Sequence, residues 1–220
     1  MTYSEVIERP AKEHFRFYAA YYLPVFAGIR AYTIDELIEG INKADGLSIF
    51  YHVFHPMFSS HVVPEDLHND FAVWIKNELH LDELAYRVSD ISAEEPRTVE
   101  DVRRDLINIL SKESYDVKAK RPFNFMTCKP VVYDLGKEAS NFAELLDQIA
   151  SITFRSIAYH FVFKRVMGYA PKNDFSLWIE RNYSEFSDIS KKLSLLDPQT
   201  YTEEEKLRED LLTILKEVFK

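Results

Sequence analysis

The chain has 220 residues and a formal net charge of −9, and 46% of its residues are hydrophobic. This composition is typical of a soluble globular protein and excludes a disordered chain, while the negative charge disfavours nucleic acid as a partner. The single cysteine, Cys128, excludes an intramolecular disulfide and a cysteine zinc site, so we expect a protein of the reducing cytoplasm.

The start of the chain and two uncharged stretches bear on membrane association. Residues 1–10 carry charged side chains and no apolar core, so we expect no signal peptide and interpret residues 1–14 as a tail. The stretch 17–29 is too short to span a bilayer, and the stretch 47–64 contains histidines, serines and Pro56. We therefore predict no membrane partner.

The first predicted elements are an extended segment and a helix. The alternation Phe15-Arg16-Phe17 favours a short strand or extended segment. Thr33 and Glu36 then have the spacing of a capping box. Apolar residues follow at helical spacing, at Ile34, Leu37, Ile38 and Ile41. This pattern predicts a helix that begins after Thr33.

Further helices are predicted along the rest of this half of the chain. The segment Ser48–His52 is rich in aromatic and β-branched residues, but its neighbours favour a helix, and we interpret it as one. Asn69 and Asp70 are typical of a helix start, because both side chains suit the first turn. Apolar stripes over Leu81–Ile91 and Val102–Leu110 predict two more helices.

The same series of elements returns in the second half of the chain. Three matches carry the repeat: Ser48–His52 with Ser156–His160, Asn69–Ile75 with Asn173–Ile179, and Arg103–Leu106 with Arg208–Leu211. The spacing between matched residues is nearly constant, and both tryptophans fall at matched positions. We therefore predict an internal duplication.

The predicted fold is mainly α, a tandem duplication of a helical unit of about 100 residues with four or five helices and a short extended segment at its start. Copy one covers residues 15–110, a linker covers 111–122, and copy two covers 123–220. Each copy is small for a self-sufficient core, so we expect one compact body with a pseudo-twofold relation. The basic run Lys118, Lys120 and Arg121 is interpreted as a solvated face of the linker.

In combination these motifs resemble one known family. The duplicated Ser-Ile-x-Tyr-His motif, the Asn-Asp-Phe-x-x-Trp motif and the Leu-Arg-like start of the last helix resemble DUF5752, an uncharacterised family of archaea and bacteria. Copy one departs from the third motif, with Val102 where copy two has Leu207. The family has no established activity, so the resemblance supports the fold and implies no catalytic residue. It also implies a loose link to carbohydrate metabolism through gene neighbourhoods.

His52 and His160 are the strongest candidates for a catalytic site, since the duplication keeps both beside a tyrosine. Asp70 and Asp174 follow them and could orient an imidazole for acid–base catalysis. The alternative is structural, with each histidine hydrogen-bonded so that it joins two helices. A feature present in both copies is more typical of folding than of one active site.

The candidates for ligand binding are polar residues kept in both copies: Tyr51, Tyr159, Asn69, Asn173, Arg103 and Arg208. The asparagines also fit as helix caps and the arginines as partners in ion pairs. A metal site would use His52, His55 and Asp70, but copy two keeps only His160 of these histidines. We therefore predict no metal and no cofactor.

We expect a non-catalytic binding or regulatory module with its site at the seam between the repeats, because ligands favour domain interfaces. Its partner is an unknown protein or small molecule, and a homo-oligomer also fits. The alternative is an enzyme, either metal-assisted or using the His–Asp pairs, linked by the resemblance to carbohydrate metabolism. An enzyme requires His52 and Asp70 to meet in a pocket open to solvent, whereas buried, hydrogen-bonded histidines argue against it.

Overall fold

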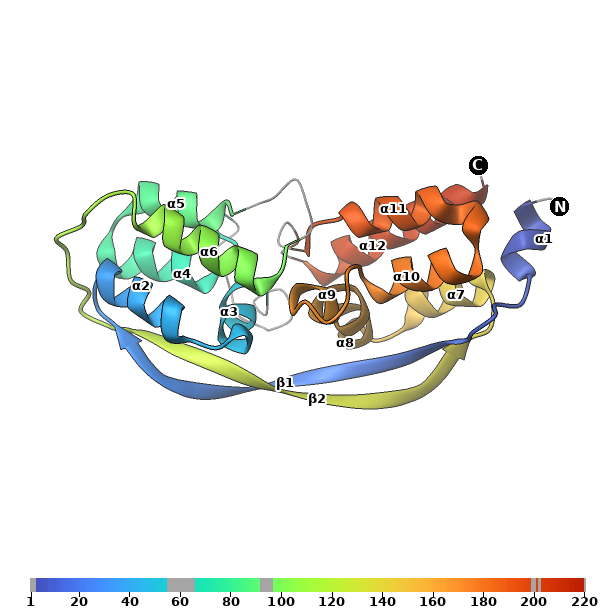
Figure 1. Cartoon of the computed structure of the whole chain (residues 1–220), viewed down its shortest axis with the longest axis horizontal. Helices are drawn as coiled ribbons and strands as arrows, with labels where there is room; N and C mark the ends of the chain where they lie inside the picture. The colour runs from blue at the N-terminus through green and yellow to red at the C-terminus, as the bar shows by residue number, and fades with distance from the viewer. Residues whose placement is uncertain (1–2, 55–65, 92–96, 199–200, 202, 220) are drawn as a thin grey trace. The chain divides into compact units, whose positions relative to one another are not determined.

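Two long strands form the sheet of this protein. The computed structural model describes residues 3–54, 66–91, 97–198, 201 and 203–219. Strands β1 (Phe15–Ala31) and β2 (Phe123–Ala139) are 17 residues long each and pair as antiparallel neighbours (Figure 1). The prediction of a mainly α fold with only a short extended segment is therefore wrong.

The burial of the strands explains why the sequence pattern indicated only their first residues. Phe15 and Phe17 are buried and Arg16 is exposed, which gives the alternation of a strand with one covered face. From Leu23 to Phe26 all side chains are exposed, so no alternation marks the strand there. Further along, Gly28 has a φ of 79°, a backbone conformation that glycine adopts readily.

The chain forms two compact units that divide both strands between them. Unit 1 contains the described residues of Met1–Tyr21 and Val131–Lys220, and unit 2 contains those of Tyr22–Ala93 and Arg97–Pro130. Unit 2 thus combines the helices of copy one with the first part of β2, and unit 1 combines the helices of copy two with the first part of β1. The predicted domains coincide with the two sequence copies. In the structure, by contrast, each compact unit contains the helices of one copy and the first strand segment of the other.

Unit 2 packs its helices on its part of the sheet. Its helices are α2 (Ile34–Lys43), α3 (Gly46–Val53), α4 (Asp70–Trp74), the π-helix η2 (Ile75–Leu79), α5 (Asp82–Ser89) and α6 (Val99–Leu110). Thr33 caps α2 by accepting a hydrogen bond from the Glu36 backbone N–H, as predicted. The segment Ser48–His52 lies in α3, which confirms that it is helical. Within unit 2 the ring of Phe123 in β2 stacks on the ring of Phe71 in α4, 4.9 Å between centroids.

Unit 1 has helices in a similar order, preceded by an N-terminal helix. Its helices are α1 (Tyr3–Glu8), α7 (Phe142–Ser151), α8 (Phe154–Ile157), the π-helix η3 (Ala158–Phe163), α9 (Lys164–Val166), α10 (Asp174–Asn182), η4 (Ser184–Phe186), α11 (Ser187–Leu195), α12 (Glu204–Leu215) and η6 (Lys216–Phe219). Phe15 of β1 stacks on Phe175 of α10, 5.2 Å between centroids, as the matched pair does in unit 2. Within the described part of the chain, every helix is too short or too polar to cross a bilayer.

Candidate functional site

A buried histidine in unit 2 ties helix α3 to a strand segment from copy two. Nδ1 of His52 lies 2.8 Å from Oδ2 of Asp70, and Nε2 accepts a hydrogen bond of 2.8 Å from the backbone N–H of Met126. Because a backbone N–H is always a donor, Nε2 is the unprotonated nitrogen and Nδ1 carries the proton. The imidazole is therefore neutral and donates to the carboxylate of Asp70.

Unit 1 contains the same arrangement with an added cation. Nδ1 of His160 lies 2.7 Å from Oδ2 of Asp174, and Nε2 accepts a 2.9 Å hydrogen bond from the backbone N–H of Tyr18. Nζ of Lys164 also donates to both carboxylate oxygens of Asp174, at 2.9 and 3.1 Å. Here the strand segment comes from copy one, so each histidine joins elements from both copies.

The titration of the pair in unit 1 agrees with this tautomer. Burial lowers the pKa of His160, outweighing the opposite effect of Asp174. Burial opposes ionisation of Asp174, but hydrogen bonds from His160 and Lys164 lower the pKa of its carboxyl. A neutral imidazole thus faces an ionised carboxylate whose charge is balanced by Lys164.

These bonds limit what the histidines can do chemically. Each imidazole is 3% exposed, and both of its ring nitrogens already have a partner. The His–Asp pairs meet as the enzyme alternative required, but a nitrogen that binds a strand N–H is not available to a substrate or a metal ion. The geometry therefore favours a structural role, in which each histidine and its aspartate hold the first segment of a strand to the helices of the unit. We call this arrangement the histidine clamp.

The other predicted residues lie at helix ends. Asn69 and Asn173 are buried N-caps of α4 and α10, and each side chain also donates to a backbone carbonyl. Arg103 donates to the carbonyls of Ile41 and Ala44, where α2 ends, and Arg208 caps α7 in the matched way. Four of the six ligand-binding candidates are therefore engaged by backbone groups.

The predicted metal trio is not brought together by the described residues. His52 and Asp70 are in contact, but His55 lies outside the described part of the chain. Among the described residues, no three side chains of histidine, cysteine, aspartate or glutamate are placed to share a metal ion. Burial raises the pKa of the Cys128 thiol to about 12, so it is a poor nucleophile at neutral pH.

A hollow opens beside each His–Asp pair. The hollow of unit 2 has a volume of about 470 Å³ and is lined by Tyr51, His52, Asp70 and Trp74, among others. The hollow of unit 1 has about 380 Å³ and is lined by the matched His160, Asp174 and Trp178. In both units the indole N–H donates to the backbone carbonyl of a residue that lies two positions before the strand, Arg121 in unit 2 and Glu13 in unit 1. Each tryptophan is therefore held at the wall of its hollow.

The two hollows differ in charge. Arg16, Lys164 and Arg181 line the hollow of unit 1, where Asp174 is the carboxylate. The hollow of unit 2 has asparagines, Asn124 and Asn77, at the positions matching the two arginines. The sequence interpretation missed these residues because it looked for what the copies share. The signal that could have found them was the difference between the copies at matched positions.

The strands, helices and hollows define a two-unit α+β protein with exchanged strand segments and a buried histidine clamp in each unit. The chain belongs to a family of unknown function, DUF5752, whose model matches residues 12–216 and confirms the predicted resemblance. It is similar to a solved structure described as the structure of OrfY from Thermoproteus tenax. The two are 39% identical, with a TM-score of 0.91 over 96% of this chain and 98% of that chain. Among curated proteins, none matches the chain.

Proposed function

We propose that the protein is a non-catalytic binding module whose hollow in unit 1 takes a small anionic molecule with a flat apolar part. The observation that carries the proposal is the charge of this hollow. In a chain with a net charge of −9, three cationic side chains line this hollow beside the single carboxylate of Asp174, whereas the matched hollow of unit 2 has one arginine, Arg121, beside two carboxylates, Asp70 and Glu78. The sequence favoured the seam between repeats, but this hollow has the more specific lining.

The cations of the hollow supply donors for an anionic group. Arg181 is exposed and has no ion-pair partner among the described residues, so its guanidinium is available to a ligand. Arg16 is ion-paired with Asp134 at 3.0 Å, but its side chain is 61% exposed, and exposed pairs of this kind exchange partners at little cost. Two arginines at one hollow favour carboxylate or phosphate, which arginine binds through two parallel hydrogen bonds.

The aromatic lining favours a flat apolar part in the same ligand. Trp178, Tyr18 and Tyr169 line the hollow, and Tyr169 is 65% exposed although large apolar rings are usually covered. Rings of this type provide stacking area at a small entropic cost. The alternative of a His–Asp acid–base enzyme has less support, because both nitrogens of His160 are engaged.

Fluorescence of Trp178 tests the proposal directly. In a Trp74→Phe background Trp178 is the only indole, and we would titrate phenyl phosphate, which is both anionic and aromatic. We expect a saturable change in emission. The double variant R16Q/R181Q should bind about a hundredfold more weakly, because each arginine that is removed loses a charge-assisted bond of about 1.4 kcal/mol, which is a factor of about ten.

The matched control is R30Q/R104Q, which removes the same charge from unit 2. It should leave the affinity unchanged. The proposal is wrong if phenyl phosphate gives no saturable change, or if both double variants weaken it equally. Release of phenol from the probe during the titration would contradict the non-catalytic part of the proposal.

A further inference from the structure

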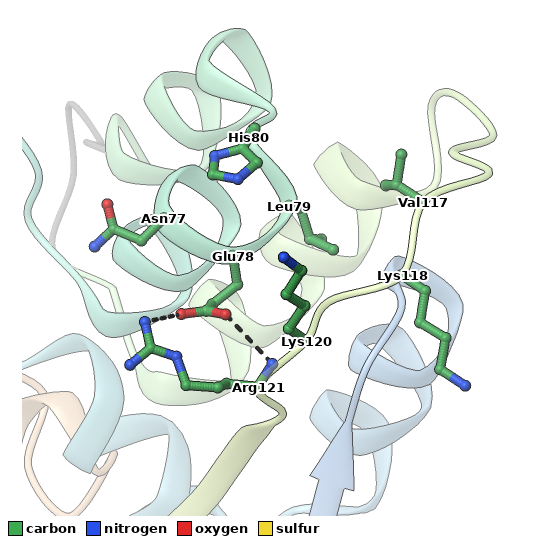
Figure 2. Close-up of a pocket in the computed structure, with 8 residues that line it drawn as sticks. All are labelled: Asn77, Glu78, Leu79, His80, Val117, Lys118, Lys120 and Arg121. Atoms are coloured by element: carbon green, nitrogen blue, oxygen red, sulfur yellow. Dashed lines mark hydrogen bonds and ion pairs between the residues drawn. The ribbon is translucent and has the colours of Figure 1, made fainter.

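A third hollow lies in unit 2, between the end of η2 and the residues that lead into β2. Its volume is about 460 Å³, and Figure 2 shows Glu78, Leu79 and His80 on one side with Lys120 and Arg121 on the other. The basic run that the sequence suggested as a solvated linker face thus borders a hollow. We infer that this hollow is a second ligand site, which takes a small phosphate-bearing molecule.

The corresponding region of unit 1 is filled by the chain itself. There Arg9 donates to the carbonyl of Asn182 and forms an ion pair of 2.7 Å with Glu185, and the Tyr183 hydroxyl donates to the carbonyl of Arg9. At the matched positions unit 2 has Val117 in place of Arg9 and Leu79 in place of Tyr183. Both replacements put a smaller side chain in unit 2. The third hollow therefore lies where the side chains of Arg9 and Tyr183 lie in unit 1.

The charges around the hollow favour an anion. Lys120 extends toward Leu79 in Figure 2 and has no ion-pair partner among the described residues. Arg121 pairs with Glu78 at 2.6 Å, but the arginine side chain is 83% exposed and the glutamate side chain only 12%. The carboxylate therefore lies on the protein side and its positive partner on the solvent side. Two cations beside one already paired carboxylate leave a positive site for a ligand.

The backbone beside the hollow has an unusual conformation. His80 ends the π-helix η2 with a φ of 56°, and it is the one non-glycine residue with positive φ among those described. A left-handed residue other than glycine costs about 1–2 kcal/mol, and such outliers and π-helical turns gather at functional sites. His80 lines the hollow from the side opposite the two cations (Figure 2).

A phosphate group suits this set of donors. It carries up to two negative charges and has oxygens enough to accept from lysine, arginine and histidine together. A volume of about 460 Å³ falls in the range of small-molecule sites. The site is separate from the hollow of unit 1 and does not depend on the function proposed for it.

Calorimetric titration with inorganic pyrophosphate tests the inference on the full chain carrying R16Q/R181Q, in which anion binding at the hollow of unit 1 is already weakened. We expect binding that weakens about tenfold in K120Q and weakens further as salt is raised. Lys12 occupies the matched position in unit 1, so K12Q is the control and should bind like its parent.

A second variant tests the role of the open space. V117W fills the hollow with a large neutral side chain at the position that Arg9 occupies in unit 1, and we expect pyrophosphate binding to be lost while the thermal midpoint stays within a few degrees. The inference is overturned if pyrophosphate does not bind, if K12Q and K120Q weaken binding equally, or if V117W binds like its parent.

Discussion

Replacing His160 by alanine should destabilise unit 1 by about 2–5 kcal/mol. The backbone N–H of Tyr18 loses its acceptor at 2.9 Å, and an orphaned buried donor costs about 1–3 kcal/mol. The imidazole also packs edge-on against Phe15, 4.8 Å between centroids, so its removal leaves a cavity worth about 1–2 kcal/mol. Asp174 keeps its two bonds from Lys164, which prevents a larger loss.

Two conservative variants separate the two bonds of the imidazole. The Gln oxygen reaches the position of Nε2, so H160Q should keep the strand bond and lose the bond to Asp174. The Asn amide reaches the position of Nδ1, so H160N should do the reverse. We expect H160Q to be the more stable of the two, because it leaves the Tyr18 N–H paired.

Urea unfolding followed by Trp178 fluorescence in a Trp74→Phe background measures the stability of unit 1. His14 is half exposed, so H14A is a control that should change stability by less than about 0.5 kcal/mol. A loss below about 1 kcal/mol in H160A would refute the clamp, and so would equal stabilities of H160Q and H160N.

The clamp also predicts a pH dependence with a definite sign. The pKa of His160 is lowered in the folded state, so between that pKa and about 6.5 the unfolded chain binds more protons. The contribution of the neutral His160 imidazole to the free energy of unfolding is complete above about pH 6.5. Below that pH it falls by up to about 1.4 kcal/mol per pH unit. The pKa of Asp174 is lowered too, so its contribution is lost at lower pH still. The difference in stability between wild type and H160Q should therefore shrink from pH 7 to pH 5.

Two further predictions concern how each unit holds its exchanged strand segment. G40A should destabilise unit 2 by about 1–3 kcal/mol in urea unfolding, because an added Cβ would lie 2.3 Å from the ring of Phe125; an unchanged midpoint would mean that the ring moves freely. Cleavage at a protease site inserted within residues 112–116 should leave both fragments eluting together, since each unit contains segments from both. Separation of the fragments without denaturant would contradict the exchange.

The helical part of the fold could be predicted from sequence because its signals are local. Thr33 and Asn141 cap the helices that follow them, and the buried stripes follow those caps. The long strands could not, because β1 alternates only near Phe15 and then has both faces exposed. That exposed stretch includes Leu23 and Phe26, which are three positions apart and therefore fit the apolar face of a helix equally well.

The candidate site was predictable only in part. The pairing of His160 with Asp174 could be suggested from sequence, because both residues lie in one copy and the matched pair recurs in the other. The bond of His160 to Tyr18 could not, since the two residues are 142 positions apart and belong to different copies. Pairing between distant segments depends on how the chain closes, and no local pattern encodes it. The charge of the unit 1 hollow was visible as Arg16 against Asn124, but only the structure shows which residues are neighbours.

The exchange of strand segments sets an order for folding during synthesis. Unit 2 has all its segments once residue 130 has left the ribosome, whereas Phe15–Tyr21 must wait for the helices that begin at Phe142. At roughly 5–20 residues per second the remaining 90 or so residues take several seconds to emerge. During that time the nascent chain displays an aromatic strand without its helices, a form of segment that chaperones bind. Cells that make large amounts of this protein should therefore need such protection for its N-terminal segment.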